Sequence, residues 1–346
     1  MITFRTFIIV DLKTARALEQ LTYPAEWHLK VLQDPSLRHW EYADGSGFFT
    51  SMGNGNDQSA NGMVPAKEVL ILAESQVIAD NVFSLMHSSS LLAYPDKYTI
   101  KSTIGLMEVK DSQVVDFKES SFGTYFTRNE YLYIGVLILL KGWGNPSKLY
   151  SIEKYEVSIG LDSFTPHSAN PIYGQVFDNF NPSYHYHVIA SYAVICAFSI
   201  IEEIGLEIRS GAAKQRFIKE GEKSSWNPVI YNETDNRLKE IGLSASYNFH
   251  WVERGAETEV QRDVKPKFGL PVYPDHLEIR DVNVELIEAI HRCSYIRNFI
   301  AAHKFQALTQ FISPYDVYNV QSVSRLLLIH KLGLWSKLLS WRDYIK

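Results

Sequence analysis

The spacing of apolar residues predicts both strands and helices, with the strands concentrated in the first half of the chain. The opening "MITFRTFIIVDL" carries a short apolar run typical of a strand, and "KTARALEQL" has helical spacing. A broad apolar stripe at helical spacing predicts a helix over Pro65–Ala93. Three strand-like runs follow between residues 97 and 126. The first part of the chain therefore mixes the two kinds of element.

The pattern changes to long helices from about residue 180, after two segments that are harder to assign or shorter. The segment "YLYIGVLILLKGW" (131–143) is apolar on all sides, so its periodicity fits a buried strand and a buried helix equally well. Beyond it, helical spacing and capping residues predict four helices: 148–161; 183–210, with Ser183 as N-cap and Gly211 as the residue after the C-cap; 281–305, with Asp281 as N-cap; and 314–334.

These elements predict an α+β protein in two parts. A mixed N-terminal domain covers residues 1–146, and an all-α domain covers 147–346, with a polar insertion around 212–280. The 346 residues suffice for about two domains of roughly 150 residues each. The Gly-, Asn- and Ser-rich stretch 44–62 contains no phosphate-binding pattern, and we expect a loop there.

Composition narrows the class of protein. The chain is 46% hydrophobic and 21% charged, which is ordinary for a globular protein. Its net charge of −5 argues against a surface built throughout to hold nucleic acid, although a local basic site remains compatible with it. Two cysteines, Cys196 and Cys293, cannot make a disulfide framework. The longest apolar run, Val188–Ile201, is shorter than the roughly 20 residues that span a bilayer, and the N-terminus does not resemble a signal peptide. We expect a soluble, cytoplasmic protein that does not enter membranes.

Candidate chemistry lies in "RNFIAAH", residues 297–303. A histidine with a pKa near neutrality can remove the proton of an RNA 2′-hydroxyl or protonate the leaving 5′-oxygen. An arginine is always charged and its planar fork matches phosphate oxygens. In this scheme His303 is the general acid or base, Arg297 is the phosphate clamp, and Asn298 orients the histidine or the phosphate by a side-chain hydrogen bond. The reaction needs no metal and leaves a 2′,3′-cyclic phosphate and a 5′-hydroxyl.

The spacing has two weaknesses. Six residues at 100° each place Arg297 and His303 about 120° apart, with about 9 Å of rise between them. They cooperate only if the helix bends or if a second copy of the chain supplies half of the site. The spacing is also not specific, because Arg325 and His330 in "RLLLIH" nearly repeat it. Of these two arginines, only Arg297 is followed directly by an asparagine.

The motif, together with the long apolar helix that precedes it, resembles the R-polar-x(3–5)-H signature of the HEPN superfamily. The resemblance covers roughly residues 180–340, and residues 1–146 are not part of it. It implies a helical-bundle endoribonuclease of a bacterial toxin or anti-phage defence system, acting as a homodimer, with Arg297, Asn298 and His303 as the matching site residues. It also implies that the additional domain recognises a trigger or an antitoxin.

Two acidic residues near the end of the 183–210 helix, Glu202 and Glu203, are candidates to support the site by pairing with Arg297. The alternative is that they are ordinary surface glutamates. Arg297 itself could serve only as a salt bridge between helices, and His303 could only complete the apolar stripe. A HEPN-like domain that binds RNA or a protein partner without cutting is a further alternative.

Basic residues interleaved with Phe217 and Trp226 are candidates to grip single-stranded RNA by phosphate contact and stacking. These basic candidates are Lys214, Arg216, Lys219, Lys223, Lys265 and Lys267. The alternative is a solvated connecting loop. His185 and His187 are two residues apart and do not share a helix face, so we expect no metal site. No cofactor-binding pattern is present in the sequence, and no residues of the N-terminal domain suggest chemistry.

Overall fold

The computed structural model describes residues 1–31, 39–42, 48–50, 66–94, 105–109, 122–125, 129–161, 184–208, 216–220, 223–254, 279–301, 312 and 314–335. The chain divides into two compact units, Met1–Glu153 and Lys154–Trp335, and the boundary falls within helix α4 (Pro146–Leu161). The boundary predicted after residue 146 lies at the start of the same helix. Both units contain helices and strands, which confirms the α+β class.

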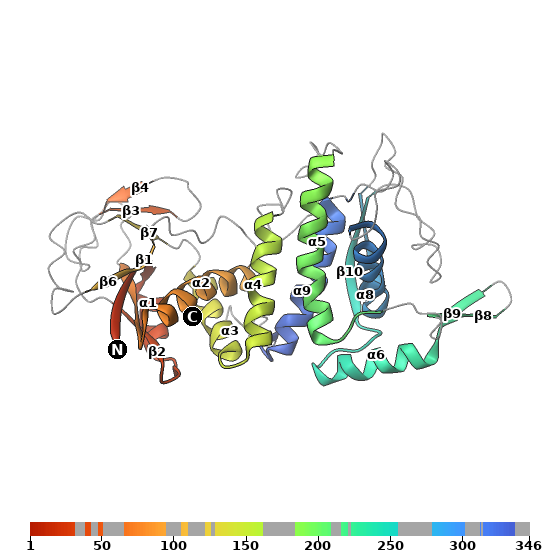
Figure 1. Cartoon of the computed structure of the whole chain (residues 1–346), viewed down its shortest axis with the longest axis horizontal. Coiled ribbons are helices and arrows are strands. Elements are labelled where there is room, and N and C mark those ends of the chain that lie inside the picture. The colour runs from red at the N-terminus through yellow and green to blue at the C-terminus, as the bar shows by residue number, and fades with distance from the viewer. Residues whose placement is uncertain are drawn as a thin grey trace. The chain divides into compact units, whose positions relative to one another are not determined.

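The N-terminal unit is built on a mixed sheet with the strand order β2-β5-β1-β7-β3-β4, and β6 also pairs with β1 (Figure 1). The strands β1 and β3 run parallel to β7, and the other pairs are antiparallel. The elements of this unit are β1 (Ile2–Asp11), α1 (Leu12–Glu19), β2 (Trp27–Val31), β3 (His39–Tyr42), β4 (Phe48–Thr50), β5 (Ala66–Ala73), α2 (Gln76–Ala93), β6 (Met107–Val109), β7 (Phe122–Tyr125), α3 (Asn129–Gly142) and the first part of α4 (Pro146–Leu161).

Strand β1 changes partners at a bulge. Residues up to Arg5 pair with β6, and from Ile8 onward the same edge pairs with β7. The register with β5 shifts over the same interval, and Phe7 has a φ of 57°. Glu68 holds this bulge, because it accepts hydrogen bonds from Nε and Nη2 of Arg5 and from the backbone N–H of Phe7. The buried ion pair of Arg5 and Glu68 therefore stabilises the bulge at which β1 changes its partner from β6 to β7.

Two predictions for this unit are corrected or decided by the structure. The single helix predicted over Pro65–Ala93 is wrong, because residues 66–73 form strand β5 between β1 and β2. The helix α2 begins only after Ser75, whose side chain accepts a hydrogen bond from the N–H of Ile78. The ambiguous segment 131–143 is helical and forms most of α3.

Helices α2 and α3 pack closely at Gly135. A Cβ atom built on Gly135 would lie 2.8 Å from the Cα of Ser90 and 2.3 Å from its Oγ. Ser90 turns its hydroxyl to the carbonyl of Met86 in its own helix, which satisfies the buried group. The missing side chain therefore sets the distance between the two helices.

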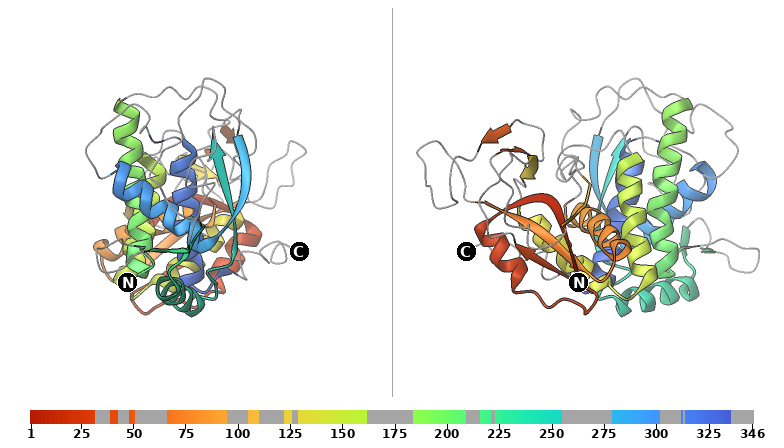
Figure 2. Two further views of the ribbon diagram at one scale, coloured as in Figure 1. Left: turned by 90° about the vertical axis from the view of Figure 1, so that its right-hand side faces the viewer. Right: turned by 60° about the vertical axis from the view of Figure 1, so that its left-hand side comes forward.

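In the C-terminal unit, α5 and α9 lie side by side and carry much of the core (Figures 1 and 2). A buried hydrogen bond joins the two helices, since the hydroxyl of Ser324 on α9 donates to the carbonyl of Ala197 on α5. The elements of this unit are the rest of α4, α5 (Tyr184–Ile204), β8 (Phe217–Glu220), β9 (Lys223–Trp226), α6 (Pro228–Glu240), β10 (Asn248–Arg254), β11 (Ile279–Glu285), α8 (Leu286–Tyr295), the π-helical turn η3 (Ile296–Ala301) and α9 (Pro314–Lys331).

The prediction that this unit is all-α is wrong. Residues 279–285 form strand β11, which pairs with β10 in an antiparallel register. Asp281, predicted as a helix N-cap, lies opposite Val252 in this ladder. On the other side of β10, the side chain of Asn319 accepts from the N–H of Val252 and donates to its carbonyl, so an α9 amide continues the hydrogen bonding of the strand.

The end of α5 also differs from the prediction. The helix stops at Ile204 and the following Gly205 has a φ of 77°, so Gly205 and not Gly211 takes the left-handed position after the helix. Ser183 lies outside the described residues. Within them, α5 is the one helix long and apolar enough to cross a membrane by length and composition, and 44% of its apolar window is buried inside the protein.

Candidate functional site

The candidate site lies where a regular helix becomes a π-helical turn. Helix α8 buries one apolar stripe, which contains Leu286, Ala289 and Cys293, and Ile296 continues it. From Ile296 to Ala301 the backbone changes to π-helical geometry. Such turns are rare and occur frequently at functional sites. Arg297 and Asn298 are the second and third residues of this turn.

Arg297 is held by groups from two elements. Its Nη2 lies 3.5 Å from Oε1 of Glu202 on α5, and its Nη1 donates a hydrogen bond of 2.8 Å to Oδ1 of Asn298. The guanidinium carbon lies 5.9 Å from the centre of the Phe198 ring, within the range of a cation–π contact. The side chain remains 33% exposed. Arg297 is therefore restrained but accessible from solvent.

The two glutamates near the end of α5 have different partners. Glu202 pairs with Arg297, which confirms that one of the two makes this contact. Glu203 instead lies 3.4 Å from Nζ of Lys154 on α4. Of the two glutamates, Glu202 is therefore the one whose contact with Arg297 the structure records.

Asn298 was expected to orient the histidine or the phosphate. In the structure its carbonyl oxygen accepts a hydrogen bond from Arg297, so that oxygen holds the arginine. His303 lies outside the described residues, and so do Lys214, Lys265 and Lys267. Lys219 and Lys223 lie on the strands β8 and β9, with their side chains outside the described part.

Arg216 does not lie on an open surface, where basic residues were expected to grip RNA. Arg216 is only 5% exposed, and its Nη1 lies 3.1 Å from Nδ1 of His291 on α8. Burial lowers the pKa of Arg216 to about 10. Burial, together with the charges of Arg216 and Arg292, lowers the pKa of His291 to about 3. Sequence reasoning missed His291, because it sits in an apolar helix without any motif around it.

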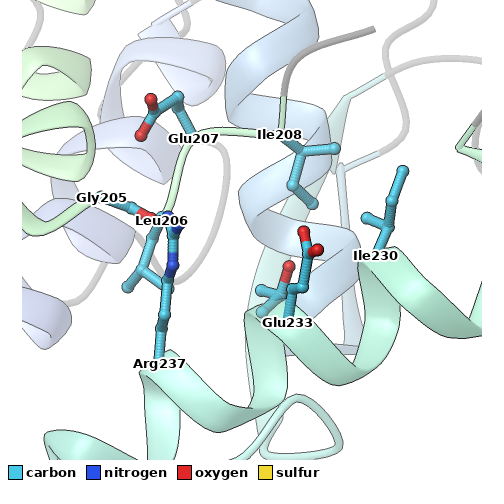
Figure 3. Close-up of a pocket in the computed structure, with 8 residues that line it drawn as sticks. Gly205, Leu206, Glu207, Ile208, Ile230, Glu233 and Arg237 are labelled. Carbon is cyan, nitrogen blue, oxygen red and sulfur yellow. Dashed lines mark hydrogen bonds between the residues drawn. The ribbon is translucent and has the colours of Figure 1, made fainter. Parts of the chain in front are cut away.

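A pocket of about 210 Å³ opens beside the segment that follows α5. Figure 3 shows Glu233 and Arg237 rising from α6 toward Gly205–Ile208. Arg237 donates from Nη1 to the carbonyl of Gly205, so its charge is directed at the end of α5. The acidic groups that line the pocket, Glu207 and Glu233, disfavour a phosphate there. The pocket therefore does not suit an RNA backbone.

Other reactive groups do not gather in the described part of the chain. There, no cluster of three or more histidine, cysteine, aspartate or glutamate residues is arranged to hold a metal ion. His187 uses its Nδ1 to accept a hydrogen bond from the N–H of Ile312. Burial raises the pKa of Cys293 far above its usual range and also raises that of Cys196, so neither is an activated thiol. No model of a protein family, no curated protein and no solved structure matches this chain.

Proposed function

We propose that the protein is a metal-independent endoribonuclease of the HEPN type. His303 acts as general acid or base, and Arg297 binds the scissile phosphate and the charge that develops on it. Attack by the 2′-hydroxyl gives a 2′,3′-cyclic phosphate and a 5′-hydroxyl. Two copies of the chain face each other to complete the site, in a bacterial toxin or anti-phage defence setting.

The observation that carries this proposal is the environment of Arg297. A surface arginine normally has many conformations, and fixing one costs side-chain entropy. Here Glu202 and Asn298 contact the guanidinium while Phe198 lies beneath it. This arrangement restrains the guanidinium before a phosphate arrives, which is the requirement for electrostatic stabilisation of a transition state.

The contact between Arg297 and Glu202 is also long enough for Arg297 to bind a phosphate at the same time. Its 3.5 Å separation exceeds the 2.7–2.9 Å typical of a charge-assisted N–H···O hydrogen bond. Glu202 therefore orients Arg297 without occupying its donors completely. A phosphate can approach the exposed third of the side chain while the carboxylate stays in place.

The test compares wild type with His303→Ala and Arg297→Ala on total tRNA and on a single-stranded RNA, in EDTA. Products are resolved on a denaturing gel, and their ends are tested for cyclic phosphate. We expect cleavage by wild type that survives EDTA, and a loss of at least about 100-fold in each variant, as is typical when a general acid or base, or a donor to the charge of the transition state, is removed.

A matched control is His330→Gln. The pair Arg325 and His330 has almost the same spacing in sequence, but Nδ1 of His330 contacts the carbonyl of Ile241 and its ring stacks on Trp335 at 4.9 Å. This variant should keep full activity. Cleavage that needs a divalent metal, or that persists in His303→Ala, contradicts the proposal.

One observation favours the alternative, a HEPN-like protein that binds a partner without cutting. The N-terminal half of α5 exposes Tyr184, Val188 and Tyr192, at 65%, 52% and 59%. Four-residue spacing places them on one face of the helix. Absence of cleavage by a wild-type protein shown to be folded and dimeric would favour this binding role.

A further inference from the structure

An unusual arginine lies at the base of the β8–β9 hairpin. Arg216 precedes β8, and its carbonyl accepts a hydrogen bond from the N–H of Asn227, which closes the hairpin. The side chain turns inward to His291, which is 1% exposed. The rings of Phe217 and Trp226 contact each other across the hairpin at 4.6 Å and meet the His291 ring edge-on.

The hydrogen bond between Arg216 and His291 fixes where the histidine proton lies. A guanidinium only donates, so Nδ1 of His291 accepts from Nη1 of Arg216. With its pKa at about 3 the ring is neutral, and its single proton must be on Nε2. Nε2 of His291 is buried without a hydrogen-bond partner, and so is Nε of Arg216. The cluster therefore contains two buried donors that lack an acceptor.

Other buried arginines in the described residues use this same edge of the guanidinium for a carboxylate. Arg5 donates from Nε and Nη2 to Glu68, at 3.0 and 2.6 Å. Arg292 donates from Nε, at 2.9 Å, and from Nη2 to Glu288. The Nε of Arg216 has no such carboxylate, and burial alone accounts for the lowered pKa of Arg216. Among the described residues, no carboxylate pairs with this desolvated positive charge.

We propose that Arg216 and His291 form a binding site for a phosphate group. A buried cation without a partner is costly, and an oxyanion on the Nε–Nη2 edge would neutralise it with two parallel hydrogen bonds. Water can accept the hydrogen bonds but leaves the charge uncompensated. The adjacent Phe217 and Trp226 favour a phosphate that carries a base, because nucleobases stack on aromatic rings.

Access to the site depends on the hairpin. In the described residues β8 pairs with β9 alone, and the hairpin extends away from the helices of its unit (Figures 1 and 2). A two-stranded hairpin is only marginally stable without further packing. A small movement at Phe217 and Trp226 would admit the anion, which would then hold the hairpin against α8.

The experiment measures thermal unfolding and calorimetric binding with inorganic phosphate at constant ionic strength, with chloride as the reference ion. The variant is Arg216→Met, and the matched control is Arg237→Met, an exposed arginine of the same unit. Phosphate should raise the Tm of wild type and of the control by about 2 to 6 °C at roughly ten times its Kd. Arg216→Met should show no rise, and in chloride it should be at least as stable as wild type.

Binding measurements with other anions identify the kind of molecule that carries the phosphate. A nucleoside 5′-monophosphate that binds at least tenfold more tightly than inorganic phosphate, through Arg216, supports a nucleotide or RNA origin. Equal binding of both supports free phosphate. A response to citrate but not to phosphate, an equal response in Arg216→Met, or no response in wild type overturns the site. Because the readout is binding, the site can succeed or fail independently of the ribonuclease test.

Arg216→Lys covers the case in which the methionine variant does not fold. It keeps the charge but lacks the fork, so its affinity for phosphate should fall at least about tenfold while the hairpin remains docked. Unchanged affinity in this variant would contradict bidentate binding.

Discussion

At the scale of single residues, two arginines of the C-terminal unit, Arg297 and Arg216, differ in exposure and in partners. Arg297 is one-third exposed and is restrained by an acidic neighbour, whereas Arg216 is buried and its Nε lacks a hydrogen-bond partner among the described residues. The first arrangement keeps a cation available to an incoming group. The second stores an unfavourable charge that a bound anion would relieve.

The orienting role of Glu202 can be separated from its effect on stability. Its pair with Arg297 is partly exposed and contributes at most about 1 kcal/mol to folding. If the ribonuclease proposal holds, Glu202→Gln should lower the cleavage rate by about tenfold, which corresponds to about 1.4 kcal/mol of transition-state stabilisation. Single-turnover cleavage and urea unfolding measure the two effects separately.

Glu203→Gln is the matched control for this prediction. Glu203 lies next to Glu202 in the same helix, but its partner is Lys154. We expect nearly unchanged cleavage, together with a similarly small change in stability. Equal losses in the two variants would assign the effect to the net charge of α5 and not to the contact with Arg297.

His291 makes the stability of the fold depend on pH. Burial, with the charges of Arg216 and Arg292, lowers its folded pKa to about 3, below the value of about 6.5 in an unfolded chain. The unfolded chain therefore takes up the proton first. Above pH 6.5 the neutral His291 leaves the free energy of unfolding at its full value. As the pH falls from 6.5 toward 3, protonation of this histidine in the unfolded chain lowers that free energy by about 1.4 kcal/mol per pH unit.

Urea unfolding at pH 7 and pH 5 tests this prediction. In chloride buffer, wild type should lose about 2 kcal/mol more than His291→Gln between the two values, because the glutamine does not titrate. Parallel losses in the two proteins would show that His291 is already protonated, or is accessible to solvent, in the folded state.

At the scale of elements, the contact of α2 with α3 depends on one absent side chain. Gly135→Ala would place a methyl group against the backbone of Ser90, and overpacking of this kind costs about 1–3 kcal/mol. Gly160→Ala in α4 meets only Oε1 of Glu156, at 3.9 Å, so it should be neutral or stabilise by about 0.5–1 kcal/mol. Urea unfolding of both variants measures their free energies of unfolding. A loss at Gly135 with no loss at Gly160 would show that the steric clash outweighs the better helix propensity of alanine.

The elements that sequence reasoning assigned wrongly are strands whose partners lie far away in the chain. Residues 69–73 form a continuous apolar run, which fits a buried strand as well as a helix, and only pairing with β1 and β2 decides. In β11 the alternation of Val282 and Val284 was a signal for a strand, but the helical stripe that follows obscured it. Helices such as α4 and α9 depend on local spacing and were located well, whereas the uniformly apolar α3 could not be distinguished from a strand.

At the scale of the whole molecule, the sequence supplied the α+β class and a division near α4, but not the mixed composition of the C-terminal unit. The resemblance that carried Arg297 also suggested that Glu202 or Glu203 pairs with it, and Glu202 does. The Arg216–His291 contact joins residues 75 positions apart on different elements. No local pattern encodes such a contact, so it had to come from the folded chain.

The π-helical turn at Ile296–Ala301 has a consequence for the length of the chain. Each hydrogen-bonded loop in a π-turn encloses one residue more than a loop in an α-helix. Deleting one residue there can therefore convert the turn to α-helix while α8 stays in register with its neighbours. The interval between Arg297 and His303 is thus one in which this protein's lineage can lose or gain a residue without rebuilding the core, and a family of such chains should vary in length at this point.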